Sequence, residues 1–252
     1  NEIIPLNVSE DFYSVFEVVI QLGAILAVVI LFWKQIFPFG KKDNRHPLAK
    51  KGILSYVKGD IFVLWIKILV ACIPAAIVGI LFNDYFEALF YNSTCVAIAL
   101  IVFGVAFIVI ETVHKNMHPK VNHLKQLTML HVILIGVFQL IAAIFPGTSR
   151  SGATIVGALL IGVSRTVAAE FTFFLAIPVM FGASLLKIVQ FGFSFTSMEI
   201  ILLLTGMLSA FIVSLLVIKF LMSYIKKHDF KIFGWYRIVL GIVVLLAFHF
   251  LL

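Results

Sequence analysis

The sequence predicts an all-α, polytopic membrane protein. Of its 252 residues, 62% are hydrophobic and only 12% are charged, whereas a soluble domain carries about 25% charged residues. Several apolar runs also reach the ~20 residues that a helix needs to cross the hydrocarbon core of a bilayer. Together these observations predict about six transmembrane helices and one helical pair of a different kind.

Helical segments are expected wherever an apolar run lies between polar or charged stretches. The first three segments are full spans, and the fourth ends at Pro146-Gly147. The fifth is too short to cross a bilayer comfortably, and the last three are again full spans. The expected segments are about 15–37, 61–82, 94–113, 128–145, 151–163, 169–190, 199–221 and 236–252.

Three loops carry most of the basic residues, and loops rich in Lys and Arg face the cytoplasm. We therefore place these loops inside, and the loops 83–93 and 191–197, which contain no Lys or Arg, outside. The same rule accounts for the net charge of +7 without a nucleic-acid partner. The basic residues are Lys41, Lys42, Arg45, Lys50, Lys51 and Lys58 in the first loop, Lys115, Lys120 and Lys125 in the second, and Lys226, Lys227, Lys231 and Arg237 in the third.

We expect the fourth and fifth segments to form a re-entrant hairpin, about 128–163, that enters the membrane from inside. Non-helical backbone at membrane depth is tolerated only where protein buries it or where it lines a wet cavity. Broken helices of this kind occur in folds built from inverted repeats. We expect that architecture here, although the partner repeat is not visible, and we expect residues 1–252 to form a single integral membrane domain.

The polar tip of this hairpin, residues 146–154, is suited to bind phosphate. Pro146 ends one helix, and Gly147 permits a turn. Either Ser149 or Ser151 can cap the next helix, whose first N–H groups and positive dipole end attract an anion. Arg150 can grip phosphate oxygens with its planar guanidinium, although a helix break with a snorkelling arginine would give the same pattern. The predicted phosphate-binding residues are Gly147, Thr148, Gly152, Ala153 and Thr154, the last three through free N–H groups.

The stretch PGTSRSGATI at 146–155 resembles the second signature of the undecaprenyl-diphosphate phosphatase family, the bacitracin-resistance phosphatases. The stretches FEVVIQLGAILAV at 16–28 and AEFTFFLAIPVMFGAS at 169–184 are also similar to that family. The three stretches occur in the family's order, and the resemblance extends from about residue 15 to the end of the chain.

This resemblance implies a multi-pass hydrolase of the bacterial plasma membrane. The implied reaction converts undecaprenyl diphosphate to undecaprenyl phosphate and inorganic phosphate. It recycles the lipid carrier of peptidoglycan synthesis, supports cell-wall biogenesis and cell shape, and confers bacitracin resistance. The resemblance also implies an outward-facing site that uses a divalent cation, Mg²⁺ or Ca²⁺. Carried over to this sequence, the implied catalytic residues are Ser149, Arg150 and Ser151.

The family's site also uses spaced acidic residues and a Ser-Ser-x-Gly-His stretch, which have no counterpart in this sequence from Asn1 onward. We therefore expect the chain to lack an N-terminal helix and half of the site, including the metal ligands. On this expectation, residues 1–252 alone bind a polyprenyl diphosphate weakly and hydrolyse it very slowly or not at all.

Acidic and amide side chains outside the tip segment are weaker candidates. Glu17 and Gln21 lie one turn apart and share a helix face. They would hold a metal or a phosphate-bound water, or they would only support helix packing. Glu170 is expected to pair with Arg165 or Arg150 in a structural role.

The remaining polar residues are expected to be structural. His131 and Gln139 would form interhelical hydrogen bonds, and Lys67 would snorkel or pair. The loop histidines and the two cysteines are expected to bind no metal. These residues are His114, His118, His123, Cys72 and Cys95.

Two other functional classes were compared with hydrolysis by this family. A broken helix that carries an arginine also suits a lipid or anion transporter or flippase. A second group of lipid phosphatases uses a histidine nucleophile and needs His and Asp soon after Ser-Arg, but residues 151–156 contain neither. The expected partners are a polyprenyl diphosphate lipid and membrane lipids, a homo-oligomer is left open, and no nucleic acid is expected.

Overall fold

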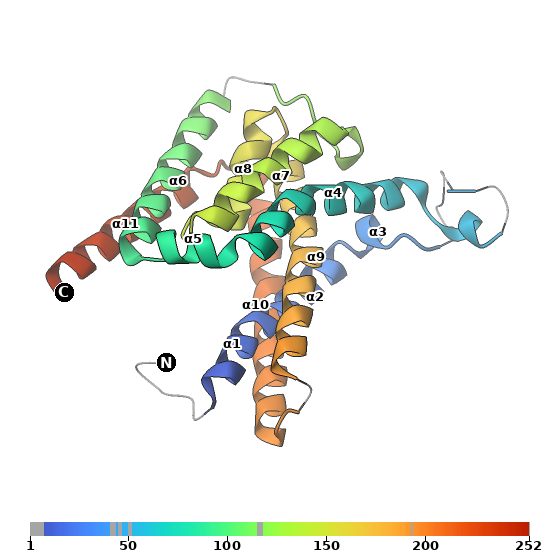
Figure 1. The fold of residues 1–252 in the computed structure, drawn as a ribbon. Helices are drawn as coiled ribbons and strands as arrows, with labels where there is room; N and C mark the ends of the chain where they lie inside the picture. Colours follow the sequence, from blue (N-terminus) through green and yellow to red (C-terminus); the bar gives the residue numbers. More distant parts are fainter. Residues whose placement is uncertain are drawn as a thin grey trace. The chain divides into compact units, whose positions relative to one another are not determined.

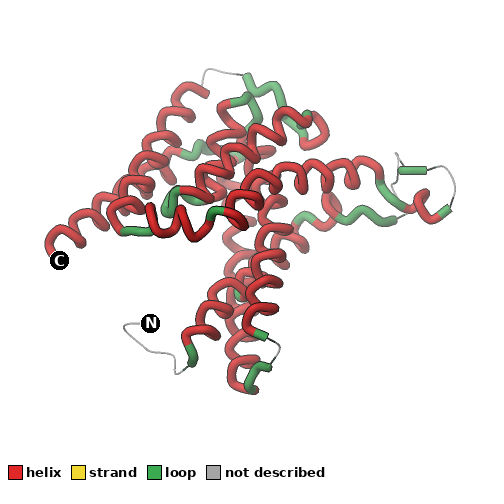
Figure 2. Tube along the Cα trace, viewed as in Figure 1, coloured by secondary structure: helices red, strands yellow, loops and turns green. Residues whose placement is uncertain are grey.

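A computed structural model describes residues 8–40, 44, 47–49, 52–114, 118–192 and 194–251. Most of these described residues are helical (Figure 2). Their β-structure is limited to isolated β-bridges. Six of the basic loop residues lie outside the described residues: Lys41, Lys42, Arg45, Lys50, Lys51 and Lys115. The α-helices are α1 (Glu10–Val19), α2 (Gln21–Leu31), α3 (Trp33–Ile36), α4 (Gly59–Leu81), α5 (Asn83–Phe90), α6 (Ser93–His114), α7 (Met129–Ile144), α8 (Arg150–Leu160), α9 (Arg165–Phe191), α10 (Ser197–Ile225) and α11 (Lys231–Leu251), with 3-10 helices at Ile53–Tyr56 and Leu124–Gln126.

The prediction of an all-α, multi-pass membrane protein is confirmed. Within the described part of the chain, 6 helical stretches are long and apolar enough to cross a bilayer. The helix α7 is apolar but shorter, as expected for an arm of the hairpin. The six stretches are Glu10–Leu31, Gly59–Leu81, Ser93–Val113, Arg165–Phe191, Ser197–Ile225 and Lys231–Phe248.

Several predicted boundaries were wrong. The first span begins at Glu10 and is interrupted at Ile20, between α1 and α2. The predicted loop 83–93 contains the helix α5, whose Phe86 stacks on Phe90 one turn later. The last helix begins at Lys231, so Lys231 and Arg237 belong to α11 and not to a cytoplasmic loop.

The chain divides into two compact units, which are described separately. The first contains the residues up to Phe37 and residues 176–221, so that it holds α1–α3, the second half of α9 and most of α10. Two side chains of α9 form hydrogen bonds with α1. The Ser184 hydroxyl donates to the carbonyl oxygen of Val18 at 3.1 Å, and Lys187 Nζ donates to Ser14 Oγ at 3.0 Å.

The second unit contains residues 38–175 and 222–252. Its closest helix pairs are α6 with α11, α4 with α7 and α7 with α8 (Figure 1). Small residues bring α6 and α11 together, since a Cβ on Gly234 would lie only 2.7 Å from the carbonyl oxygen of Gly104. Close backbone approach of this kind is a common basis of helix packing in membranes.

A buried carboxylate ties three parts of the second unit together. Glu111 on α6 is fully buried and pairs with the Arg165 guanidinium at the start of α9. Its Oε1 atom also accepts the backbone N–H of Phe230 at 3.0 Å, just before α11. The sequence had suggested Arg165 or Arg150 as a partner for Glu170, and that pairing stays a prediction. The ion pair of Arg165 is with Glu111, a carboxylate 54 residues away in the sequence.

Arg165→Gln is therefore expected to destabilise the protein, by about 3–5 kcal/mol, because it leaves the Glu111 carboxylate buried without its cation. Thermal unfolding in detergent measures the effect. The double variant Arg165→Gln/Glu111→Gln should recover part of the loss, because no buried charge is left unpaired. Equal melting temperatures for wild type and Arg165→Gln would contradict this account of the ion pair.

Candidate functional site

The helices α7 and α8 form a hairpin whose two ends lie together. The chain before α7 and the chain after α8 are joined by backbone hydrogen bonds, from Ser164 N to Val121 O and from Lys120 N to Gly162 O, both 2.9 Å long. The tip instead lies against the first turn of α6, where a Cβ on Gly147 would come 2.6 Å from the carbonyl oxygen of Val96. The helices α7 and α8 therefore pack as a helical hairpin, whose tip lies far along α6 from His114, while its re-entry into the membrane stays a prediction.

Backbone conformation at the tip is set by two residues with positive φ. Gly147 has φ +86°. Ser149 has φ 65° and ψ 118°, and is the one non-glycine residue with positive φ in the described part of the chain. Its hydroxyl accepts the N–H of Gly152 at 3.3 Å, so Ser149 and not Ser151 caps α8.

This cap corrects the prediction of which N–H groups are free. The Gly152 N–H is bound to Ser149 Oγ, and the Ala153 N–H donates to the Ser149 carbonyl at 3.0 Å as the first intrahelical bond. A helix that starts at this point leaves the N–H groups of Arg150 and Ser151 without intrahelical acceptors. The donors available to an anion thus lie two residues earlier than predicted.

Three side chains remain accessible at the tip. Ser149 and Ser151 are exposed, and their hydroxyl oxygens lie 3.1 Å apart. Arg150 is half-buried, and within the described part of the chain its guanidinium has neither a hydrogen-bond acceptor nor a carboxylate partner. A cation held in this way at a helix N-terminus is ready to bind an external anion.

The two threonines of the tip do not share this surface. Thr148 is fully buried, and its hydroxyl has no hydrogen-bond partner among the described residues. Thr154 is also buried, and its Oγ1 lies 2.9 Å from Thr172 Oγ1 on α9 and 3.1 Å from the carbonyl oxygen of Arg150. Both hydroxyls are therefore buried, and the prediction that these two residues belong to the phosphate-binding segment stays a prediction.

A second arginine, which was predicted to lie in a loop, binds the backbone of the tip from α11. Arg237 on α11 is 9% exposed. Its Nη2 atom donates to the carbonyl oxygens of Gly147 at 2.6 Å and Thr148 at 2.5 Å. An available signal was its place inside an apolar run, because an arginine within a span is expensive and marks a candidate functional residue.

Comparison with known proteins gives the family of this chain. The profile of the family described as bacitracin resistance protein BacA matches residues 1–243. The chain belongs to this family. Relatives include the undecaprenyl-diphosphatase of Desulfitobacterium hafniense, with 61% identity over 248 residues, 98% of this chain and 86% of the relative. Undecaprenyl-diphosphatase 1 of Clostridium acetobutylicum is 61% identical over 98% of this chain and 87% of the relative, and the undecaprenyl-diphosphatase of Enterococcus faecalis is 57% identical over 98% and 86%.

Glu17 and Gln21, the other candidates in this BacA family member, lie in the first unit. Both are exposed, and the Gln21 amide donates to the backbone oxygen of Glu17 at 3.2 Å. The Glu17 carboxylate therefore carries no bond from Gln21. The described residues contain no group of three or more His, Cys, Asp or Glu side chains that could hold a metal ion.

Both predictions of interhelical hydrogen bonds, for His131 and Gln139, were wrong. His131 Nδ1 lies 2.6 Å from Thr128 Oγ1 and so helps to cap its own helix. Gln139 is buried, but its amide atoms have no partner in the described part of the chain. Lys67 does pair as expected, since its Nζ donates to the carbonyl oxygen of Leu127 at 2.5 Å.

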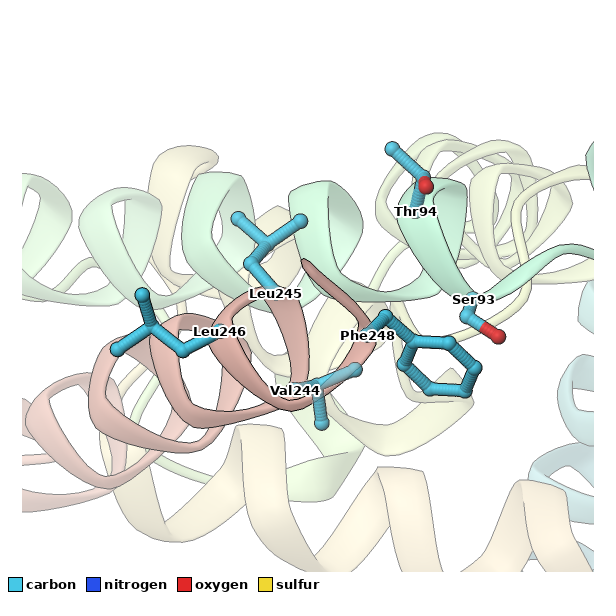
Figure 3. Close-up of a pocket in the computed structure, with 6 residues that line it drawn as sticks. All are labelled: Ser93, Thr94, Val244, Leu245, Leu246 and Phe248. Atoms are coloured by element: carbon cyan, nitrogen blue, oxygen red, sulfur yellow. The ribbon is translucent and has the colours of Figure 1, made fainter. Parts of the chain in front are cut away.

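Two cavities away from the tip do not suit a diphosphate. One of about 450 Å³ lies where the start of α6 meets the end of α11 (Figure 3). It offers two hydroxyls and no charged side chain to a ligand. Its lining residues are Ser93, Thr94, Val244, Leu245, Leu246 and Phe248. Another, of about 300 Å³, lies in the first unit beside Asp11 and Lys187, and the Lys187 ammonium there is already bound to Ser14.

Proposed function

We propose that this protein hydrolyses undecaprenyl diphosphate to undecaprenyl phosphate and inorganic phosphate. This reaction would recycle the lipid carrier of peptidoglycan synthesis and confer resistance to bacitracin. The observation that carries the proposal is the partnerless Arg150 guanidinium at the N-terminus of α8, beside two exposed serines. Membership of the BacA family and the names of the relatives give the chemical identity of the substrate.

The tip suits the charge of a diphosphate. The guanidinium of Arg150 can donate two parallel hydrogen bonds to one phosphate group. The N–H groups of Arg150 and Ser151 and the dipole of α8 would add positive potential at the same place. Charge moves toward the leaving phosphate as the anhydride bond breaks, so donors fixed beforehand stabilise the transition state more than the substrate.

The two serines would have different roles. Ser149 uses its hydroxyl oxygen as the acceptor for the Gly152 N–H, and it therefore serves mainly to shape the turn. Ser151 is exposed and can donate to a phosphate oxygen. Neither hydroxyl has an imidazole or carboxylate bonded to it in the described part of the chain, and a hydroxyl without a base is a weak nucleophile.

A divalent cation, Mg²⁺ or Ca²⁺, is part of the proposal through the family resemblance. The side chains accessible at the tip are hydroxyls and a guanidinium, and this set does not fit such a cation, which prefers carboxylate and carbonyl oxygens. We therefore derive no step through the metal.

The loop charges support an orientation for the site. The tip contacts α6 near Val96, at the end of α6 that follows α5, which carries Glu87 and no basic residue. The paired ends of the hairpin lie with Lys120, on the side of the second basic loop. Because basic loops face the cytoplasm, we propose that the tip approaches the membrane from inside and opens outward.

Cysteine labelling tests this orientation in intact cells, after Cys72 and Cys95 have been replaced. Cysteines at Lys120 and Lys227 should be protected from a membrane-impermeant thiol reagent, and a cysteine at Ser194 should react. A cysteine at Asp84 should react as well. Reaction at Lys227 from outside would invert the topology and so refute the outward-facing site.

Phosphate release tests the proposed reaction. The protein, expressed from its complete natural gene, is incubated in detergent with undecaprenyl diphosphate and Mg²⁺. Equal amounts of undecaprenyl phosphate and inorganic phosphate should appear, and a chelator should stop the reaction until Mg²⁺ is restored. Intact diphosphate that moves across proteoliposomes containing the protein would favour a transporter instead.

A further inference from the structure

Arg237 holds the two peptide groups that precede the cap of α8. Its Nη2 donates to the carbonyl oxygens of Gly147 and Thr148, so both carbonyls point toward α11. A bare carbonyl oxygen at this tip would present negative partial charge to a phosphate. By binding both oxygens, Arg237 leaves the positive side of the turn, with its N–H groups, for the anion.

The peptide group between Thr148 and Ser149 also sets the φ angle of Ser149. That angle is 65°, with ψ at 118°, a combination that costs a serine side chain energy unless the surroundings impose it. The Arg237 bond to the Thr148 carbonyl fixes this peptide plane. The strained turn is therefore held from outside the hairpin, by a side chain 89 residues later in the sequence.

Burying the Arg237 guanidinium is costly, because not all of its donors are hydrogen-bonded. Its Nε atom is buried and has no hydrogen-bond partner in the described part of the chain. Its Nη1 atom lies near the first turn of α8, since a Cβ on Gly152 would come within 3.2 Å of it. A buried arginine that leaves one donor unused is better explained by what it holds than by its contribution to stability.

We propose that Arg237 is a positioning residue for phosphate binding. It does not touch the substrate, but it fixes the turn 147–149 so that Arg150 and the first N–H groups of α8 face the phosphate. The inference rests on the proposed function and adds to it a residue from α11. It predicts that loss of Arg237 impairs turnover through the tip, even where the protein stays folded.

The test compares Arg237→Gln with the matched substitution Arg165→Gln, which also removes a guanidinium from the second unit but does not contact the tip. Melting temperature, kcat and KM for undecaprenyl diphosphate are measured for each, together with hydrogen–deuterium exchange of residues 146–154. Arg237→Gln should lower kcat by roughly 10²-fold, as small misplacements of binding groups do. Exchange should accelerate in 146–154 above all.

The control should behave in the opposite way. Arg165→Gln should lower the melting temperature while kcat per folded molecule and exchange at the tip stay close to wild type. Arg237→Lys keeps a charge and a donor and should regain part of the lost turnover. It also serves as the test variant, with the same expected direction, if Arg237→Gln yields no folded protein.

Wild-type kcat in Arg237→Gln, or an equal loss of kcat in both variants, would overturn the proposal. If the wild-type protein releases no phosphate, the proposed function itself fails, and the exchange measurement still decides the role of Arg237. Unchanged exchange of residues 146–154 in Arg237→Gln would then show that Arg237 does not hold the turn.

Discussion

Replacing Arg150 with alanine is expected to lower the turnover of undecaprenyl diphosphate by about 10²–10³-fold, the range seen when one fixed donor to a developing charge is removed. The half-buried guanidinium has no partner within the described part of the protein, so its donors are available to the substrate. The same absence predicts that Arg150→Ala melts at or slightly above the wild-type temperature, because binding residues are often kept at a cost in stability.

Two variants sharpen this prediction. Arg150→Lys retains the charge but not the bidentate geometry, so it too should lose most of the activity. Ser149→Ala removes the cap and should cost stability instead, typically about 1 kcal/mol. Near-normal phosphate release by a well-folded Arg150→Ala protein would exclude Arg150 from the mechanism.

Gly147→Ala is expected to abolish most activity and to lower the melting temperature. The residue has φ +86°, and its new Cβ would lie 2.6 Å from the backbone oxygen of Val96. The strained φ costs about 1–3 kcal/mol, and the clash adds about as much again. Because neither backbone can move easily, the whole tip must shift away from α6, and Arg150 moves with it.

Gly162→Ala provides the matched control for Gly147→Ala. Gly162 has nearly the same φ, +84°, but the nearest atom to its Cβ would be Lys120 Cγ at 4.0 Å. This variant carries the φ cost without the clash and lies at the other end of α8. Its melting temperature should fall less, and its kcat should stay near wild type. Equal activity in the two variants would show that the fit of the tip against α6 is unimportant.

Much of this fold was predictable because lipid imposes simple requirements. A helix must be about 20 residues long and apolar to span the membrane, and the six spans follow from that rule. The hairpin was predictable from Pro146-Gly147, because a proline followed by a glycine favours a helix end and a turn. The helix α5 was missed because only eight residues form it, and its aromatic side chains find partners such as Phe145 only after folding.

The candidate site was predictable only in its local part. The residue types at 146–154 identify an anion-binding turn, but two serines were equally suited to cap α8, and the choice depends on the backbone angles of Ser149. The role of Arg237 depends on Gly147, 90 residues away in the sequence. The role of Glu111 depends on Arg165 and Phe230, which are 54 and 119 residues away. Arg237 lies near a helix start rich in basic residues, so charge alone placed it wrongly in a loop and not in α11.

The most direct test of the account is a structure of the protein with a non-hydrolysable undecaprenyl diphosphate analogue, in which a methylene group replaces the bridging oxygen. We expect phosphonate oxygens at about 2.7–3.0 Å from the Arg150 guanidinium and from the N–H groups of Arg150 and Ser151, with the Arg237 bonds to the turn unchanged. A head group bound away from residues 146–154, with Arg150 still lacking a partner, would contradict the account.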